Sequence, residues 1–549
     1  MRNRRLILLL ALTAVILYDA VLPLWEGWDE PFHFGYVQAL QYWNELPVVG
    51  KTTISKEVET SFFLTPLPKF LSDAVPGSTS FAQQPELAFD ARARLRDQLL
   101  RIPIGLQREK SAFPNYEAQQ APLAYLLLIP FDAALGRLPL IRRVFWLRIF
   151  GSVAGMLLTF FAVERLLTIF AIERRLQNVA LACILNAQVL WASMAHVGND
   201  WLAIPLTIWF IVFLARAATA SDQTDKPSSR ARKQTVLALF HQPATLRNLF
   251  AAALILGLGL LTKAYFLPFV PVLGALYLYQ ALVGRVKRSP AAYAFLLTLL
   301  IGGTWYLRNL VLFHTLAGTQ ESIRGIPPIE VFRALTSINW LKSSLALFRS
   351  SLWCGNWSFT PFPKGPLNVE MAFLLVGLVL YAAHPQPRGV GLRWVALSCG
   401  IFSAALVYQT CSAWVDSHGA LTTTEPWYIQ GVLPVVWAAV FAGLKGRRWL
   451  GFLFASSLSC LTAGIAAVTY LRFLIPGYAS GIQRPTTSEA WAWWTAHPTA
   501  DLMLVSLAPP AFVYTLLTIY LAILLIVTVS TLSAITPRSP AWSDGSNRL

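Results

Sequence analysis

The chain has 549 residues, of which 56% are hydrophobic and only 13% charged, and its formal net charge is +17. This composition excludes an ordinary soluble domain, because a folded surface in water cannot hide so much apolar area. The positive charge lies in short loops between apolar runs and no nucleic-acid motif accompanies it, so we expect contact with membrane lipids and no nucleic-acid partner.

Apolar runs of about 20 residues recur along the chain, and each is long enough to cross a bilayer core of about 30 Å. Because a backbone in lipid must satisfy its own hydrogen bonds, we predict an all-α, polytopic integral membrane protein with about twelve transmembrane helices. The first run follows the basic segment Met1–Arg5 and is interpreted as a retained helix, since no small-residue cleavage site follows it. The expected spans are residues 6–24, 144–164, 176–195, 201–217, 247–262, 264–283, 291–313, 367–384, 393–412, 427–443, 449–471 and 508–533.

Lys and Arg are concentrated in a subset of the loops, and loops of this kind face the cytoplasm in membrane proteins. This rule predicts a multi-pass protein of the inner (plasma) membrane, with both chain ends inside and the long connections facing the periplasm or exterior. The basic loops contain Arg2, Arg4 and Arg5; Arg165, Arg174 and Arg175; Arg230, Arg232 and Lys233; Arg285, Lys287 and Arg288; Arg388 and Arg393; and Lys445, Arg447 and Arg448.

Residues 122–139 are apolar enough to resemble a further span, but a crossing here would move every later basic loop to the outside. We therefore predict a re-entrant or interfacial segment, and Pro130 and Pro139 weaken it as a straight helix. Arg142 and Arg143 would then face the outer leaflet, where an anionic lipid phosphate would explain the positive charge.

The expected organisation places a transmembrane module first, then a second outer loop, and then further transmembrane helices. Amphipathic surface helices are expected within both outer loops, at 28–43, 87–100 and 339–353. The expected parts are residues 1–315 with the first outer loop at 25–121, an outer loop with an interfacial helix at 316–366, C-terminal transmembrane helices at 367–536, and a disordered tail at 537–549.

Acids follow the first span directly, in the segment Trp25-Glu26-Gly27-Trp28-Asp29-Glu30-Pro31-Phe32-His33. One interpretation is structural, with the aromatic residues in an interfacial belt and the acids capping a helix that begins near Pro31. The other is chemical: Asp29 acts as a general base with its pKa adjusted by a partly dry site, and Glu30 assists or binds a metal or a polar acceptor. His33 is a further candidate in this segment.

The segment His196-Val197-Gly198-Asn199-Asp200 lies at the outer end of an apolar hairpin. Asn199 and Asp200 suit a turn or a helix cap. An acid alone between two spans is also a functional candidate, because a buried charge there is expensive unless it has a role.

Two cations occur where positive charge is disfavoured. Lys263 separates two apolar spans, so it either extends to the lipid headgroups, meets a phosphate, or pairs with an acid. Arg308, followed by Asn309, lies near the outer end of its span, and its planar guanidinium suits a phosphate.

These acids and cations lie on one face of the membrane, and a base with a cationic clamp for a phosphate leaving group is what glycosyl transfer from a phospholipid needs. The sequence contains no Gly-rich phosphate loop or Walker pattern, and its five cysteines lack metal-ligand spacing. Taken alone, the residues indicate an outward-facing site of acids and cations without naming the reaction.

At these positions the sequence resembles the GT-C superfamily of polyprenyl-phosphate-dependent glycosyltransferases, and most of all the branch of protein O-mannosyltransferases and lipid A aminoarabinose transferases. The matching motifs appear in family order and cover roughly residues 1–315, which we interpret as a GT-C catalytic module. They are Asp29-Glu30-Pro31, Gln120-Ala121-Pro122-Leu123-Ala124-Tyr125, Asn199-Asp200, Leu261-Thr262-Lys263 and Trp305-Tyr306-Leu307-Arg308-Asn309.

The resemblance implies a GT-C fold with surface helices in the first outer loop, a polyprenyl-phosphate sugar donor and inversion at the anomeric carbon. By motif match, Asp29 would be the base, and Asp200 would orient it or bind a metal. Lys263 and Arg308 would contact the donor or its phosphate, with Gln120 and Tyr125 beside them. Members differ in their use of a divalent metal, so the resemblance leaves the cofactor open, with Asp29 and Asp200 as the candidate ligands.

The chain departs from the family pattern in two places. The family often has His-Pro-Pro or Lys-Pro where this chain has Gln120-Ala121-Pro122, and Arg142 and Arg143 can compensate for the missing cation. Later, the segment that begins at Glu425 stands where relatives often have an Arg-Tyr-Leu element, so Tyr428 is carried over while the arginine is absent.

The function expected from the sequence is therefore an inverting glycosyltransferase that moves a sugar from a polyprenyl-phosphate carrier to a glycan, lipid or protein acceptor of the cell envelope. A transporter or flippase for an anionic lipid or glycan is the first alternative, and it would place charges at mid-span. An envelope-glycan polymerase or ligase is the second, and it would favour a large late outer loop rich in Arg and His.

Overall fold

The computed structural model describes residues 2–219, 244–284, 288–358, 362–383, 389–496 and 498–536. The expected disordered tail at 537–549 lies outside these residues, as do the basic positions 230–233, 285–287 and 388.

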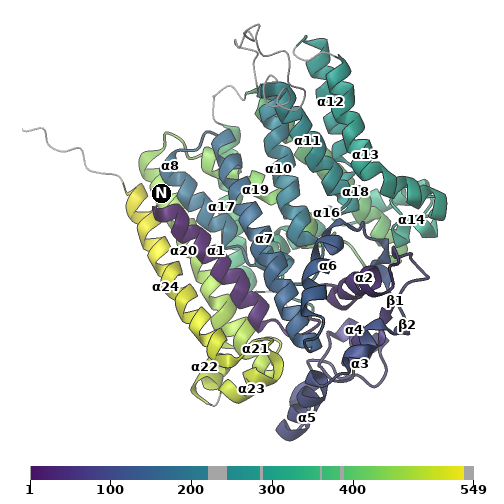
Figure 1. Cartoon of the computed structure of the whole chain (residues 1–549). Coiled ribbons are helices and arrows are strands. Elements are labelled where there is room, and N and C mark those ends of the chain that lie inside the picture. Colours follow the sequence, from purple (N-terminus) through teal and green to yellow (C-terminus); the bar gives the residue numbers. More distant parts are fainter. Residues whose placement is uncertain are drawn as a thin grey trace, which may run out of the picture.

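The described chain is all-α and polytopic, with long helices side by side and the short elements of the first outer loop gathered at one end (Figure 1). Within the described ranges, eight helical segments are long and apolar enough to cross a membrane, or nine if a bent pair at Arg174–Leu185 and Gln188–Met194 is one span. Each of the expected spans overlaps a helix, but several are shorter or less apolar than a full span, so the count of twelve stays a prediction. The long helices and their short companions are α1 (Arg2–Val21), α7 (Leu140–Ile169), α8 (Arg174–Leu185), α9 (Gln188–Met194), α10 (Asp200–Thr219), α11 (Ala244–Leu260), η5 (Ala264–Phe266), α12 (Phe269–Leu282), α13 (Arg288–Phe313), α17 (Lys364–Ala382), α18 (Val390–Asp416), η6 (Pro426–Ile429), α19 (Leu433–Ala442), α20 (Arg448–Val468), η7 (Thr469–Leu474), α21 (Ile475–Ser480) and α24 (Pro510–Ile535).

The surface helices expected in the outer loops are present as α2, α5 and α16. A small antiparallel sheet joins β1 to β2, with Thr53 opposite Pro114 and Ser55 opposite Lys110. The elements of the outer regions are α2 (Glu30–Tyr42), β1 (Thr53–Ser55), α3 (Lys56–Ser61), α4 (Lys69–Ala74), η1 (Gln84–Glu86), α5 (Phe89–Leu100), η2 (Ile104–Arg108), β2 (Lys110–Pro114), η3 (Tyr116–Gln119), α6 (Leu123–Leu135), α14 (Gln320–Arg324), α15 (Pro328–Ser337), α16 (Trp340–Leu352), α22 (Thr487–Thr495) and α23 (Pro498–Val505).

The segment expected to be re-entrant or interfacial forms α6, which has 13 residues and contains Pro130. A helix of this length extends for about 20 Å, which is less than the apolar thickness of a bilayer. Helix α6 packs against α2 and α7, so it closes the first outer loop over the membrane module.

Close packing fixes the start of α10, which matters because α10 begins at Asp200. An added Cβ at Gly155 of α7 would lie 2.5 Å from the carbonyl oxygen of Trp201, and an added Cβ at Gly151 would lie 3.2 Å from the Trp201 ring. The two glycines therefore allow α7 to pack closely against the first turn of α10. This close packing fixes the position of Asp200.

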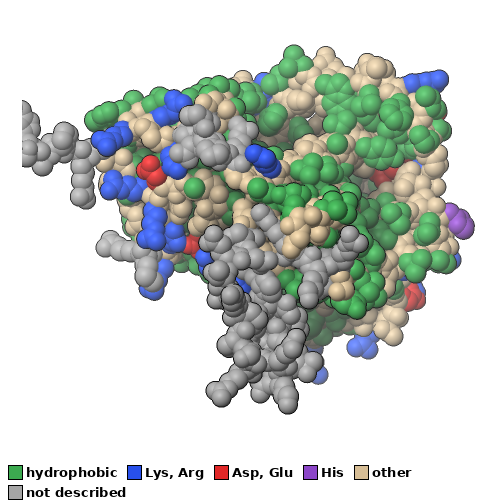
Figure 2. Space-filling model, turned by 90° about the horizontal axis from the view of Figure 1, so that it is seen from above, with side chains coloured by type: hydrophobic (Ala, Val, Ile, Leu, Met, Phe, Trp, Pro, Cys, Tyr) green, Lys and Arg blue, Asp and Glu red, His purple; other side chains and the backbone are tan. Residues whose placement is uncertain are grey.

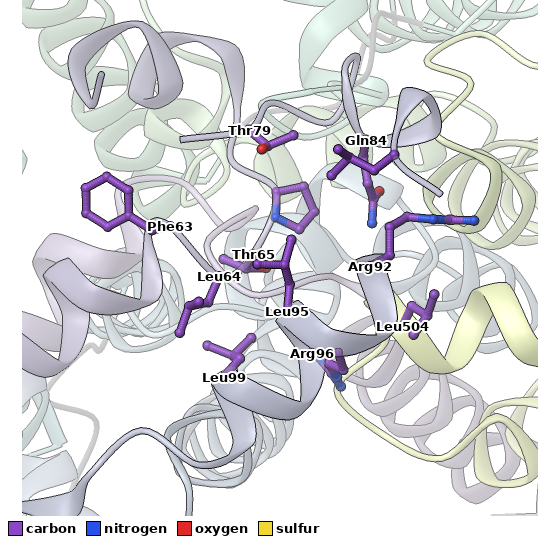
Figure 3. Close-up of a pocket in the computed structure, with 12 residues that line it drawn as sticks. Phe63, Leu64, Thr65, Thr79, Gln84, Arg92, Leu95, Arg96, Leu99 and Leu504 are labelled. Atoms are coloured by element: carbon purple, nitrogen blue, oxygen red, sulfur yellow. The ribbon is translucent and has the colours of Figure 1, made fainter. Parts of the chain in front are cut away.

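The first outer loop is also tied to the C-terminal part of the chain. The guanidinium of Arg92 on α5 lies 3.2 Å from the carboxylate of Asp501 on α23, and Arg96 donates a hydrogen bond to the carbonyl of Ser506. Figure 3 shows Arg92, Arg96 and Leu504 around the small cavity that this contact encloses. Its volume of 20 Å³ is room for about one water, so it is a packing gap in a structural joint.

Candidate functional site

Asp29 lies between α1 and α2, and its backbone adopts the left-handed conformation with φ 57° and ψ 16°. Non-glycine residues seldom adopt this conformation, and when they do they mark turns and functional sites. Asp29 occupies the N-cap position of α2, as the structural interpretation expected, but its carboxylate makes no capping hydrogen bond to the helix. Instead it accepts a hydrogen bond from the hydroxyl of Tyr116, and the Asp29 side chain is partly exposed.

Glu30, the next residue, is fully buried and paired with Arg148 of α7. Arg148 Nε donates to Glu30 Oε1 at 2.6 Å, and the guanidinium also donates to the carbonyls of Leu22 and Pro23. Glu30 Oε1 also accepts from the amide of Val197 at 2.9 Å. Glu30 therefore holds the end of α1, helix α7 and the turn before Asp200 together, which is a positioning role.

Asp200 and Lys263 form a second buried pair. Lys263 Nζ lies 2.6 Å from Asp200 Oδ1, and the two side chains are 8% and 5% exposed. The ammonium also faces the rings of Tyr428 at 5.1 Å and Tyr265 at 5.6 Å. Lys263 therefore does not extend to the lipid headgroups; of the three roles considered from the sequence, it pairs with an acid.

Polar side chains from the first outer loop complete this side of the site. Asn199 Nδ2 donates to Gln120 Oε1 at 3.0 Å, and the buried Asn199 Oδ1 has no partner among the described residues. The hydroxyl of Tyr125 lies 2.8 Å from His33 Nδ1, and Glu117 Oε2 lies 3.6 Å from the same nitrogen. Asn199 thus meets Gln120, and Tyr125 meets His33, although the members of each pair are far apart in the sequence.

The acids of this cluster influence one another. Burial raises the pKa of Asp29, and the nearby charge of Asp200 raises it further, whereas the Tyr116 hydrogen bond and Lys263 lower it. Burial and the Asp29 charge also raise the pKa of Glu117, and the same two causes raise the pKa of Glu425 to about 7. Burial, together with His196 and Lys263, lowers the pKa of His33, which favours a neutral imidazole.

The remaining candidates lie around this cluster or away from it. Arg308 is half-buried, donates to the carbonyl of Pro47 at 2.7 Å and stacks over Trp305, while the Asn309 amide donates to the carbonyl of Ala317. Both residues therefore attach α13 to outer loops, and Arg308 is near enough to Tyr36 to influence it electrostatically.

The two arginines at the start of α7 have different surroundings. Arg142 is exposed. Arg143 is completely enclosed, and its guanidinium lies 2.9 Å from both Glu57 and Asp132 and donates to Gln107. The positive charge of Arg143 is thus balanced by two protein carboxylates, Glu57 of the first outer loop and Asp132 of α6.

Several residues of the site did not emerge from the sequence. Tyr116 and Glu117 lie only a few residues before the Gln120 motif, and an acid beside a tyrosine at that place was the signal that could have found them. Trp28 stacks on Trp427 at 4.4 Å and meets the edge of His196 at 5.8 Å, so the aromatic residues around Asp29 form a wall of the site.

The structure gives no preassembled metal centre: in the described ranges, no group of three or more His, Cys, Asp and Glu side chains is arranged to hold a metal ion. Of the two candidate ligands, Asp200 is engaged by Lys263 and Asp29 by Tyr116.

No family model matches the chain, and no curated protein matches it either. Among solved structures, the chain is similar to ArnT from Cupriavidus metallidurans bound to undecaprenyl phosphate, with 13% identity over 87% of this chain and 74% of that one and a TM-score of 0.40. It is also similar to the oligosaccharyltransferase AglB from Archaeoglobus fulgidus in complex with an inhibitory peptide and a dolichol-phosphate, with 11% identity over 98% of this chain and 56% of that one and a TM-score of 0.36. At these scores the similarity is loose.

Proposed function

We propose that this chain is an inverting glycosyltransferase of the GT-C type, which moves a sugar from a polyprenyl-phosphate carrier to an envelope acceptor at the outer face of the inner membrane. The observation that carries the proposal is the placement of Asp29: a partly exposed carboxylate with a raised pKa, held in a left-handed turn beside a buried lysine. The acceptor would be a glycan, a lipid or a protein.

Asp29 would act as the general base. Its carboxylate retains an oxygen that can accept the proton of an acceptor hydroxyl while Tyr116 donates to the other. A raised pKa makes a carboxylate a stronger base, because the proton transfer becomes more favourable as the pKa approaches the working pH. The Asp29 carboxylate makes no capping hydrogen bond to α2, which leaves it available for chemistry.

Lys263 would contact the departing lipid phosphate. An ammonium has three N–H donors and Asp200 accepts from one, so the remaining donors can stabilise the charge that develops on the phosphate as the sugar leaves. In this role Asp200 positions Lys263, and the rings of Tyr428 and Tyr265 support the same cation.

The other candidates have different roles in the proposal. Gln120, Asn199, Tyr125 and His33 would line the donor side through their neutral hydrogen-bonding groups, and Glu425 would face the acceptor. Arg143 is left out of the donor contacts because its charge is already balanced by Glu57 and Asp132. Use of a divalent metal stays open, with Asp29 as the ligand that is partly exposed.

The test is turnover of purified protein in lipid nanodiscs with a panel of radiolabelled polyprenyl-phosphate sugars, measured as release of free polyprenyl phosphate. Asp29→Asn should lower turnover by about 10²- to 10⁴-fold, the usual contribution of a positioned base. The matched control is Asp90→Asn, which removes the same charge from an exposed position of α5 and should leave turnover unchanged. Equal turnover of the native protein and Asp29→Asn would remove Asp29 from the mechanism. Movement of the intact sugar-lipid across the bilayer without its cleavage would replace the transferase by a flippase.

A further inference from the structure

A large cavity lies at the opposite end of the molecule, between the first turn of α8, the turn that joins α19 to α20, and the last residue of α24. Its volume is 670 Å³, within the usual range for a small-molecule site of about 300–1,000 Å³. It opens on the face that carries the basic loops. Figure 2 looks onto this face and shows Lys and Arg side chains gathered on the side where α1 and α8 begin and α24 ends.

Three guanidinium groups line this cavity: Arg175 of α8, Arg447 of the α19–α20 turn, and Arg448 at the start of α20. Among the described residues that line it, Glu173 is the only acid, so this part of the lining carries a net positive charge. Within the part of the chain that the structure describes, none of these three side chains forms an ion pair or a hydrogen bond. Arginines left without protein partners around a cavity favour an anionic occupant, because the planar guanidinium matches two phosphate oxygens.

The backbone adds to the positive electrostatic potential of the cavity. Helices α8 and α20 both begin at the cavity. The carboxylate of the α8 cap, Glu173, accepts no capping hydrogen bond, and the α20 cap, Arg447, has no acceptor in its side chain. The first N–H groups of each helix therefore point toward the cavity without an acceptor from the cap, and they carry the positive end of the helix dipole.

The surroundings of the cavity point to a lipid. Its inner wall is apolar and includes Leu176, Phe452 and Ile535. On the outer side of the same first turns of α20, Trp449 is 65% exposed and Leu453 is 59% exposed. A tryptophan exposed beside Arg and Lys is typical of the lipid–water interface, so this exposure places the cavity at the depth of the headgroups. A phospholipid would match both surfaces, with its phosphate inside the basic cavity and its acyl chains along the exposed apolar side of α20.

We propose that this cavity binds the phosphate headgroup of an anionic phospholipid from the leaflet that borders the basic loops. Arg175, Arg447 and Arg448 hold the phosphate, and the acyl chains lie along the exposed face of α20. This site is separate from the cluster at Asp29, and the inference does not depend on the proposed reaction.

The experiment compares lipid retention in nanodiscs of phosphatidylcholine that contain a minority of phosphatidylglycerol, measured by native mass spectrometry after detergent release. The native protein should retain phosphatidylglycerol in preference to phosphatidylcholine. A variant with Arg175→Gln, Arg447→Gln and Arg448→Gln should lose about 100-fold of this preference, at about fivefold for each basic residue. The matched control replaces Arg5, Arg165 and Arg174 by Gln, which removes the same charge from exposed positions of the same face and should keep the preference.

Three results would overturn the inference. An equal loss in both triple variants would mean that the whole basic face, and no particular cavity, attracts anionic lipid. Displacement of the retained lipid by inorganic phosphate alone would identify a free anion as the ligand. Equal retention of both lipids by the native protein would by itself disprove the site. If the triple variant does not fold, the single variant Arg447→Gln replaces it, with an expected loss of preference of about fivefold.

Discussion

Arg148 and Glu30 form a two-point ion pair that is completely enclosed by protein, although 118 positions separate them in the sequence. The same guanidinium donates to two carbonyls at the end of α1, and the same carboxylate accepts from the amide of Val197. The pair thus fixes the position of Asp29, its neighbour in sequence, relative to the turn that leads into Asp200.

Breaking this pair should destabilise the protein strongly. Arg148→Met leaves the Glu30 charge buried without its counter-charge, and the expected loss is about 3–5 kcal/mol of unfolding free energy, measured as a lower thermal midpoint in zwitterionic nanodiscs. The double variant Glu30→Gln/Arg148→Met should recover part of the loss. Arg142→Met, on the exposed side of the same helix, should leave the midpoint unchanged. A normal midpoint for Arg148→Met would mean that the pair is dispensable.

A second prediction concerns Arg143, whose guanidinium is enclosed by Glu57, Asp132 and Gln107. Arg143→Met should lower the thermal midpoint by an amount similar to Arg148→Met, because two carboxylates lose their partner. The KM for the lipid-linked donor should not change in the protein that remains folded. A raised donor KM with an unchanged midpoint would return Arg143 to the donor site.

The all-α, polytopic class could be predicted from the sequence because the bilayer imposes it locally: a run of about 20 apolar residues is its own signal. Asp29, Asp200 and Lys263 were likewise identifiable, since each is a charge at the end of an apolar run. The carboxylates that pair with the buried Arg143 could not be identified in this way. Glu57 and Asp132 look like ordinary loop and helix acids, and only the folded chain brings them to Arg143, because the pairing depends on how the first outer loop packs against α7.

The pairing of Lys263 with Asp200 allows its structural and chemical contributions to be separated. Lys263→Met should lower both stability and turnover, since Asp200 loses its counter-charge and the donor phosphate loses a contact. Adding Asp200→Asn should restore the thermal midpoint, because no buried charge is then unpaired. Turnover in the double variant should stay low, with a raised donor KM. If turnover recovered together with the midpoint, Lys263 would have only a structural role.

The turnover rate should depend on pH through Asp29. Burial raises its pKa to about 6, and the base must be ionised to accept a proton, so turnover should fall as the pH decreases through about 6. Tyr116 donates to this carboxylate and thereby lowers its pKa, so Tyr116→Phe should raise the pKa and move the acid limb of the profile to higher pH. Tyr514→Phe, on α24, is the control and should leave the limb in place. A limb that does not move in Tyr116→Phe would assign the titration to another group, such as Glu425, whose pKa burial raises to about 7.

The stability of the protein should depend on pH through Glu26, which precedes Asp29 in the same turn. Its carboxylate is fully buried and accepts from the hydroxyls of Ser358 at 2.5 Å and Tyr478 at 2.8 Å, yet burial outweighs these donors and raises its pKa from 4.5 to about 7. The folded state therefore holds this proton more tightly than the unfolded chain does. The stabilisation is complete below about pH 4.5 and is lost as the pH rises through about 7, with a total of about 3 kcal/mol from the shift in pKa.

Glu26→Gln should remove this dependence, since the amide does not titrate in that window. The thermal midpoint of the native protein in zwitterionic nanodiscs should decrease between pH 5 and pH 8 by an amount on the order of several degrees, whereas the midpoint of the variant should stay nearly level. The exposed Glu86→Gln serves as the control and should behave as the native protein does. A midpoint that rises with pH in the native protein would show that Glu26 is ionised in the folded state, and the hydroxyls of Ser358 and Tyr478 would then be stabilising a buried charge.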